Sequence, residues 1–326
     1  MKIFNNPNYN FIRWRWHAII FSLVVIGAGV VTMATRGLPL GIDFSGGTLV
    51  IVQFEQPVTE DQVRDAISNV IPGDEVVQQY GDAADRQILV RLPQSEQVEQ
   101  GASLEQGAVQ IREALQKAGL PKFEVISTEV VGPVIGADLQ RRGVYATLAS
   151  ILAITIYIGF RFRFSFAVGA IAATLHDIFV TLSFLAFFGY DLSLNVVAAL
   201  LTITGYSVND TIVIFDRVRE NLRTARRDPL EQVVNTSVNQ TLSRTIITAG
   251  TTFLSVLSLF IFGGEVLRGF AFTMLVGIIA GTYSTIFIAS SIAIILSQRK
   301  RSSAAAASAP AATPRSGRKS GRARAS

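Results

Sequence analysis

Cysteine is absent from the 326 residues of this sequence, and only 16% of the residues are charged. The absence of cysteine excludes a disulfide framework and a thiolate metal site. A soluble domain carries about 25% charged residues, so the shortage of charge argues against an ordinary soluble protein. The motifs G-x-x-x-x-G-K-[ST], H-E-x-x-H and G-x-S-x-G, which are typical of ATP hydrolysis, zinc proteolysis and serine hydrolysis, are also missing. We therefore expect no enzyme activity, no cofactor, and no catalytic or metal-binding residues.

Apolar residues make up 49% of the chain. They are gathered into runs of about twenty residues that contain almost no charge, and a helix of that length crosses a hydrocarbon core of about 30 Å. The sequence therefore predicts a polytopic α-helical membrane protein with six transmembrane helices. The expected spans are residues 17–35, 143–160, 164–187, 193–215, 243–263 and 269–296.

Lysine and arginine are distributed unevenly between the segments that join these spans. Residues 1–16, 216–242 and 297–326 are basic, whereas residues 36–140 contain 16 acidic and 7 basic side chains. Cytoplasmic segments carry the excess of Lys and Arg, so we expect both termini in the cytoplasm and residues 36–142 on the far side of a bacterial inner membrane. The first span is expected to stay as an uncleaved anchor. The segment 216–242 is expected as a loop with an amphipathic helix, and the tail as disordered.

The outer segment, 36–142, alternates between strand and helix patterns. Its expected elements, in chain order, are a strand at 48–54, a helix at 59–70, strands at 76–80 and 87–92, a helix at 104–117 and a strand at 123–131. The order β-α-β-β-α-β predicts an α+β ferredoxin-like domain on the periplasmic side of the membrane. A fold of this kind does not by itself assign a function.

Two ionisable residues, Asp210 and Arg244, fall inside the fourth and fifth spans near their cytoplasmic ends. An ionisable side chain inside a bilayer is costly, and it usually marks an ion pathway or a paired charge. Because the two spans are antiparallel neighbours, the residues are expected at similar depth, where they can form an ion pair. We interpret Asp210 as the carboxylate that takes up and releases a proton and Arg244 as the cation that adjusts its affinity. The alternative is a static structural pair.

Hydroxyl side chains, among them Thr245, Thr248 and Thr252, follow the fifth span at intervals of three and four residues. This spacing places them on one helix face, and with Asn209 beside the carboxylate they indicate a hydrated polar path.

A second pair of ionisable residues, His176 and Asp177, lies in the middle of the third span. Both titrate, so they are candidates for a relay. The alternative is a polar patch that orients the span against a neighbour.

Several motifs along the chain resemble the SecF family of protein-export membrane proteins, which is part of the SecD/SecF group in the RND superfamily. They are GIDFSGG at 41–47, VGPVIGADL at 131–139, HD at 176–177, SVNDTIVIFDRVRENLR at 207–223, and Ser243-Arg244-Thr245. The motif GIDFSGG is shared with the sister family SecD, whereas the long run at 207–223 is specific. The resemblance covers the chain up to about residue 300 and leaves only the tail outside.

The resemblance implies a subunit that, with SecD, uses the proton or sodium motive force to promote the late, ATP-independent stage of polypeptide translocation across the inner membrane. It implies association with the SecYEG channel and, less directly, with YajC and the motor SecA, and an unfolded exported polypeptide as the client. No nucleic acid is expected as a partner. Asp210 and Arg244 match the family's functional carboxylate and arginine.

Two other functions remain as alternatives on the sequence alone. One is half of an RND-type small-molecule exporter, against which the single small outer domain argues. The other is a non-conducting scaffold that stabilises the translocon, against which the polar face of the fifth span argues.

Overall fold

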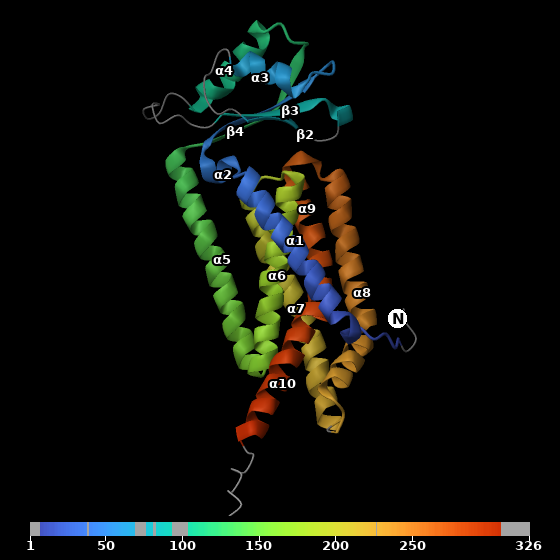
Figure 1. The fold of residues 1–326 in the computed structure, drawn as a ribbon. Helices are drawn as coiled ribbons and strands as arrows, with labels where there is room; N and C mark the ends of the chain where they lie inside the picture. Colours follow the sequence, from blue (N-terminus) through green and yellow to red (C-terminus); the bar gives the residue numbers. More distant parts are fainter. Residues whose placement is uncertain are drawn as a thin grey trace, which may run out of the picture.

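The computed structural model describes residues 7–37, 39–68, 76–80, 83–92, 104–225 and 227–307. Long helices form a bundle, and a small α/β domain lies across one end of it (Figure 1). The N-terminal segment and the end of the last helix lie at the opposite end of the bundle (Figure 1). This arrangement agrees with an even number of spans between the two ends of the chain.

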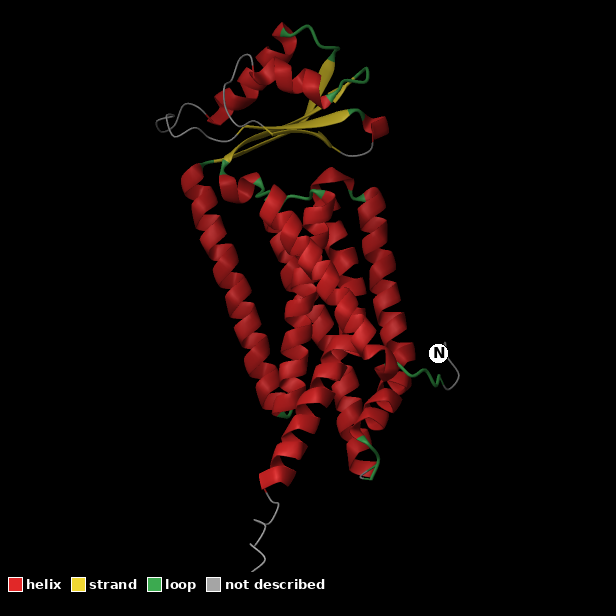
Figure 2. Cartoon of the chain, in the orientation of Figure 1, coloured by secondary structure: helices red, strands yellow, loops and turns green. Residues whose placement is uncertain are grey.

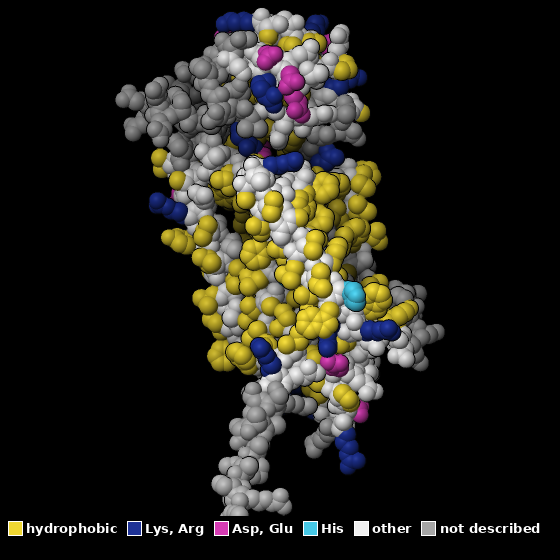
Figure 3. Space-filling model, viewed as in Figure 1, with side chains coloured by type: hydrophobic (Ala, Val, Ile, Leu, Met, Phe, Trp, Pro, Cys, Tyr) yellow, Lys and Arg dark blue, Asp and Glu magenta, His cyan; other side chains and the backbone are white. Residues whose placement is uncertain are grey.

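Six helical segments among the described residues are long and apolar enough to cross a membrane, which confirms the predicted class. They are formed by helices α1 (Arg15–Arg36), α5 (Pro133–Arg161), α6 (Phe164–Phe188), α7 (Leu194–Thr224) and α8 (Leu230–Phe262), and by the continuous run of α9 (Gly264–Ser284), η3 (Thr285–Ala289) and α10 (Ser290–Ala307). Hydrophobic side chains cover the helical part of the surface in the view of Figure 3, as expected for a surface that faces lipid.

Several helices continue beyond the apolar stretch that predicted them. Helix α5 begins at Pro133, inside the range assigned to the outer domain, and α7 runs on to Thr224, into the range expected as a loop with an amphipathic helix. The last helix continues to Ala307, so residues 297–307 are helical where a disordered tail was predicted; residues 308–326 lie outside the described part. Hydropathy marks the part of a helix that lies in lipid, whereas backbone hydrogen bonding decides where the helix ends.

Helices α6, α7 and the α9–α10 run form the centre of the bundle. Small residues allow the close approach of α9 to α7: a Cβ atom on Gly277 would lie 2.2 Å from the side chain of Ile203, and one on Gly281 would lie 3.0 Å from Cβ of Ser207. Gly277 and Gly281, four residues apart, therefore form a small-residue face of α9 that packs on α7. Helices α5 and α8 are peripheral, with few buried side chains in their membrane-spanning windows.

The last spanning run changes its winding at its middle. Segment η3 (Thr285–Ala289) is π-helical, and the hydroxyl of Ser290 donates to the carbonyl oxygen of Thr285, five residues earlier, at 3.1 Å. Such π-helical turns often occur at functional sites. This one directly follows Tyr283 and Ser284, two residues of the candidate site.

The outer domain is a four-stranded antiparallel sheet with helices α3 (Glu60–Ser68) and α4 (Leu104–Lys117) on one face (Figure 2). Its strands are β1 (Gly47–Phe54), β2 (Val76–Tyr80), β3 (Gln87–Leu92) and β4 (Phe123–Val131), in the order β2-β3-β1-β4. The elements match the predicted ones in type and in their order along the chain. The strand order is compatible with a ferredoxin-like arrangement. The hydroxyl of Thr59 accepts a hydrogen bond from the backbone N–H of Gln62, and Oε1 of Gln62 accepts one from the backbone N–H of Thr59, so a capping box starts α3.

The sheet buries apolar side chains on both faces. On one face, Val50, Val52 and Phe54 pack with residues of α3 and α4. On the other face, which is directed toward the bundle (Figure 2), a smaller cluster contains Leu49, Ile51, Leu89 and Ile42. Two buried faces explain why β1 is apolar along nearly its whole length instead of alternating.

The motif at 41–47 forms the turn between the membrane and the sheet. Its residues Ile42–Ser45 make the short helix α2, and Gly46 and Gly47 follow with φ of 69° and 119°. Glycine adopts these positive angles at little cost. The two glycines therefore let the chain turn sharply from α2 into β1.

Candidate functional site

Asp210 lies on α7, and its carboxylate faces α8. Its Oδ1 atom accepts a hydrogen bond from the hydroxyl of Thr245 at 2.9 Å. The other oxygen, Oδ2, is buried and has no hydrogen-bond partner among the described residues. A buried carboxylate oxygen without a partner is costly. Oδ2 can therefore accept one more hydrogen bond or take up a proton.

Arg244 does not form the predicted ion pair with Asp210. No contact of 4.0 Å or less between the two charged groups occurs, and Thr245, one residue further on, occupies the position beside the carboxylate. One residue along a helix rotates the side chain by about 100°, and this rotation turns Arg244 to the exposed side of α8. Its charge still acts on Asp210 at longer range.

The predicted polar face of α8 is divided between the inside and the outside of the bundle. Thr245 is buried against α7, and Thr252 is partly buried. Thr248 is exposed, and so is Asn209 on α7. Thr251, Ser255 and Ser258 continue this exposed row, each donating to a carbonyl of its own helix. These residues therefore line an outward-facing surface of the chain, and they do not enclose a path within it.

His176 and Asp177 lie at the centre of the bundle and are buried, with Asp177 only 1% exposed. Nδ1 of His176 lies 3.0 Å from Oδ1 of Asp177. Oδ2 of the same carboxylate accepts bonds from the hydroxyls of Ser207 on α7 and Ser284 on α9, the latter at 2.9 Å. Asp177 thereby joins three helices through hydrogen bonds, which is how a buried carboxylate is accommodated.

The network extends from His176 to the first helix. Nε2 of His176 lies 2.9 Å from the hydroxyl of Ser22 on α1, and Ser22 contacts the hydroxyl of Tyr283 at 3.3 Å. The Tyr283 hydroxyl donates to the carbonyl oxygen of Ala18 at 2.7 Å, and its ring stacks on the imidazole. We call Ser22, His176, Asp177, Ser207, Tyr283 and Ser284 the central polar cluster.

Sequence reasoning found two members of this cluster and missed its serines and tyrosine as partners. Ser22 and Tyr283 are 154 and 107 positions from His176, and nothing local marks either as its partner. A single hydroxyl in an apolar run is usually bonded to its own helix.

A second buried charge pair lies at the junction between the outer domain and the bundle. Arg91 of β3 bonds to Asp191, in the loop between α6 and α7, and to the carbonyl oxygen of Leu40 at 3.1 Å. Burial raises the pKa of Asp191, and the Arg91 guanidinium offsets only part of that increase. Asp43 of α2 accepts a bond from the backbone N–H of Leu194 at the start of α7. Charged side chains therefore connect the domain to the helices.

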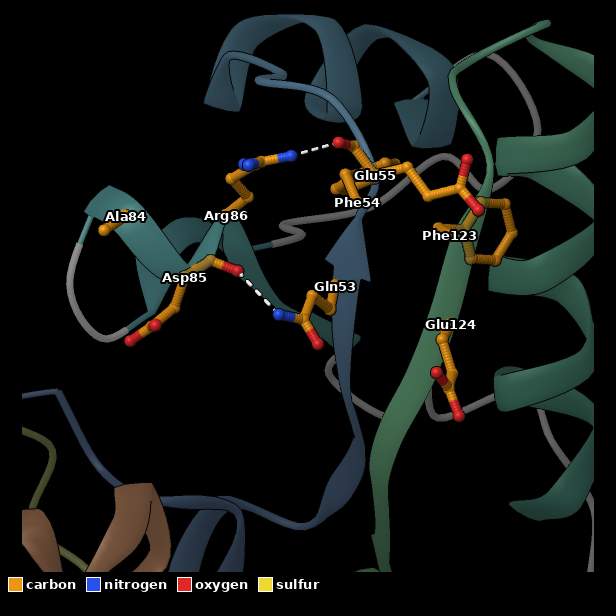
Figure 4. Close-up of a pocket in the computed structure, with 8 residues that line it drawn as sticks. All are labelled: Gln53, Phe54, Glu55, Ala84, Asp85, Arg86, Phe123 and Glu124. Atoms are coloured by element: carbon orange, nitrogen blue, oxygen red, sulfur yellow. Dashed lines mark hydrogen bonds between the residues drawn. The ribbon is translucent and has the colours of Figure 1, made fainter. Parts of the chain in front are cut away.

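The outer domain also has a cavity of about 360 Å³ at one end of its sheet (Figure 4). In Figure 4, Gln53 donates to the backbone oxygen of Asp85 at 3.0 Å, and Arg86 donates to the backbone oxygen of Glu55. These side chains already stabilise the loop, so we assign no ligand there. Within the described ranges, no group of three or more His, Asp or Glu side chains is placed to hold a metal ion.

Family models match two parts of the chain. The model described as "Protein export membrane protein SecD/SecF, C-terminal" matches residues 110–299, and the model described as "SecD/SecF GG Motif" matches residues 31–58. The first match contains Asp210 and the central residues of α6 to α9. The second contains the glycine turn between α2 and β1.

Curated relatives and solved structures agree with these models. The chain is 45% identical to the protein translocase subunit SecF of Desulfurispirillum indicum, over 86% of this chain and 89% of that protein. It is 39% identical to SecF of Escherichia coli O157:H7, over 90% of this chain and 89% of that protein.

The crystal structure of SecDF from Thermus thermophilus, described as a translocon-associated membrane protein, superposes with a TM-score of 0.79 at 34% identity. A second SecDF structure, in a super-membrane-facing form, gives 0.67 at 36% identity. The matches cover 91% and 94% of this chain but only 39% and 41% of the solved chains.

Proposed function

The chain belongs to the SecF family of protein translocase subunits, and from this we propose that it acts with SecD to couple the proton or sodium motive force to polypeptide export across the bacterial inner membrane. Asp210 is the ion-binding group in this proposal. The observation that carries it is the buried oxygen Oδ2 of Asp210, which has no partner among the described residues and lies beside the polar surface of α8.

The polar surface of α8 requires a polar environment. Arg244, Thr248 and Asn209 are exposed on the membrane-spanning part of the bundle. A guanidinium exposed to lipid is unfavourable by at least about 2.5 kcal/mol near the bilayer centre, whereas one that faces a protein partner or water is not. A second membrane protein on this surface would complete an ion path of which this chain supplies one wall.

The length of the solved relatives is consistent with such a partner. This chain corresponds to 39% of the SecDF chain of Thermus thermophilus, whose name joins SecD and SecF. In a bacterium that makes the two halves separately, SecD would supply the other wall. Contacts with SecYEG, and less directly with YajC and SecA, belong to the same proposal. So does an orientation with both termini in the cytoplasm.

The available energy is sufficient for this role. One proton crossing about 150 mV releases about 3.5 kcal/mol, which shifts a two-state equilibrium about three-hundredfold. The outer domain is linked to the bundle through α2 and the Arg91–Asp191 pair, so a shift among the helices can reach it. The client of this movement would be the unfolded polypeptide that emerges from the channel.

The test is an Asp210→Asn variant, co-expressed with SecD in a strain that lacks both subunits. We expect normal accumulation of the protein with a loss of both secretion and ion conductance. Asp216→Asn is the matched control, because Asp216 lies on the same helix and is paired with Arg161 at 2.6 Å near the end of α5. Normal secretion in the Asp210 variant would contradict coupling and favour the scaffold function. Loss of drug resistance in place of secretion would favour a small-molecule exporter.

A further inference from the structure

The chain segment that precedes α1 is held by two asparagines of α8. The backbone N–H of Tyr9 donates to Oδ1 of Asn239 at 2.9 Å, and Nδ2 of Asn239 donates to the carbonyl oxygen of Tyr9 at 2.8 Å. One turn earlier on α8, Asn235 accepts from the backbone N–H of Phe11 at 2.9 Å and donates to the same Tyr9 oxygen at 3.0 Å. The two side-chain amides therefore satisfy an irregular stretch of backbone as a neighbouring strand would.

Apolar and charged contacts strengthen this attachment. Ile12 is only 5% exposed. It belongs to the same apolar cluster as three residues of α8, which are Val234, Val238 and Leu242. Arg15 forms an ion pair with Glu231 at 2.7 Å, and the same carboxylate accepts a bond from Gln298 of α10 at 3.1 Å. The first residues of a chain are usually poorly ordered unless such contacts hold them. We call residues 9–15 the N-terminal clamp.

The clamp lies on the half of α8 that is buried. Nine of the ten buried residues of α8 lie between Leu230 and Thr245, and the tenth is Val256. Thr245 is thus the last residue of the anchored stretch, and it donates to Asp210 at 2.9 Å. One residue along a helix turns a side chain by about 100°. The rotation of this stretch therefore decides whether Thr245 or the exposed Arg244 faces Asp210.

Helix α8 is held from two sides at the level of the clamp. On the side of α7, Asn221 donates to the hydroxyl of Ser237 at 2.8 Å. Asn239, two residues further on, is turned by about 200° from Ser237 and holds the clamp. A helix that is held on one side can roll against its neighbour, whereas contacts on opposite sides prevent rolling. The clamp thus supplies the contact that α7 cannot.

We propose that Asn235 and Asn239 are positioning residues. By binding the N-terminal clamp they fix the rotation of α8, and this rotation places the Thr245 hydroxyl on Asp210. Neither asparagine touches the carboxylate, so both act only through Thr245. The effect of the clamp on α8 stands on the contacts alone, whereas its effect on export rests on the proposed function.

The first test uses the absence of cysteine from the chain. Thr245→Cys introduces a single thiol at a position that is 1% exposed, where N-ethylmaleimide should react slowly. Adding Asn235→Ala and Asn239→Ala opens the clamp. We expect the labelling rate of the full chain in lipid nanodiscs to rise by about fivefold or more, the effect of losing at least one hydrogen bond. An unchanged rate would overturn the positioning role.

Controls separate rotation of α8 from local damage to it. Gln232→Ala removes an exposed amide from the same helix and should leave the labelling rate unchanged. Tyr9→Pro opens the clamp from its other side, because proline has no N–H to donate to Asn239 and α8 keeps its sequence. It should raise the rate as the asparagine variant does. Faster labelling in the asparagine variant alone would contradict the proposal.

Hydrogen exchange shows whether the clamp has opened. The backbone N–H groups of Tyr9 and Phe11 donate to the two asparagines, so both should lose protection when Asn235 and Asn239 are replaced by alanine. Unchanged protection would show that the asparagines do not hold the segment, and it would also overturn the proposal.

Combination with Thr245→Val tests the consequence for export. Asn235→Ala with Asn239→Ala should lower gradient-driven export about fivefold in the parent and cause no further loss in Thr245→Val, because residues that act through one contact are not additive. Losses that add in full would indicate general destabilisation. The labelling test needs neither SecD nor an ion gradient. Its failure is therefore distinguishable from normal secretion in Asp210→Asn, which would contradict the proposed function.

Discussion

Arg91 in the outer domain and Asp191 in the loop between two membrane helices form an ion pair across a sequence separation of 100 residues. Both side chains are largely buried, with 8% and 19% exposed. The isolated bridge between Leu40 and Leu192 lies beside them and brings the two loops together through backbone hydrogen bonds. The ion pair fixes how the domain meets the bundle.

Replacing one member of this pair should be much more harmful than replacing both. Arg91→Met leaves a buried carboxylate without a cation, and we expect a loss of about 3–5 kcal/mol in the free energy of unfolding. The double variant Arg91→Met with Asp191→Leu should recover most of the loss. Denaturant unfolding of the full chain in detergent measures both. Arg142→Met is the control, because it breaks an exposed pair with Asp138 and should change stability by about 1 kcal/mol or less.

Glu129 should make the outer domain less stable as the pH rises. Partial burial, and next the nearby charge of Asp43, raise the pKa of Glu129 above its ordinary value of 4.5. A carboxyl whose pKa is raised by folding contributes stability below its unfolded value and loses that contribution as the pH rises through its folded value. Relative to the parent, Glu129→Gln should therefore gain melting temperature between about pH 4 and pH 7. Glu124→Gln, five residues earlier on the same strand, is the control and should leave the pH dependence of the melting temperature unchanged.

Gly169 should not tolerate a methyl group. A Cβ atom there would lie 2.6 Å from the carbonyl oxygen of Ala289, in the π-helical segment of the last span. Backbone cannot move aside as a flexible side chain can, so Gly169→Ala is expected to lower stability by about 1–3 kcal/mol. At Gly159 on α5 no atom lies within 4 Å of the added Cβ. Thermal unfolding should show Gly159→Ala as neutral or slightly stabilising, and equal losses in both variants would contradict this packing.

Thr245 should matter for export through its hydrogen bond to Asp210. Thr245→Val keeps the shape of the side chain but removes the 2.9 Å bond, which is worth about 1.5 kcal/mol or more to a charged acceptor. We expect export driven by the ion gradient to fall about tenfold. Thr245→Ser should restore it. Thr147→Val on the peripheral helix α5, which removes a bond to a carbonyl of its own helix, should leave export near the parent level.

Much of the architecture was predictable because its signals are local. Length and hydropathy determine a membrane span within a window of about twenty residues. The periods of 2.0 and 3.6 residues distinguish strands from helices within about a dozen residues. The six spans and the order of the outer-domain elements follow from these rules. Helix ends were less predictable, as the early start of α5 at Pro133 and the continuation of α10 to Ala307 illustrate.

The sequence by itself determined the membrane class, the number of spans and the two intramembrane carboxylates, Asp177 and Asp210, because each of these depends only on residues close together in the chain. Only the tertiary structure decided which donors meet those carboxylates. Thr245 took the place predicted for Arg244, and Ser22 reached His176 from a helix 154 residues away. Helix rotation and packing set these contacts, and both depend on every neighbouring helix at once.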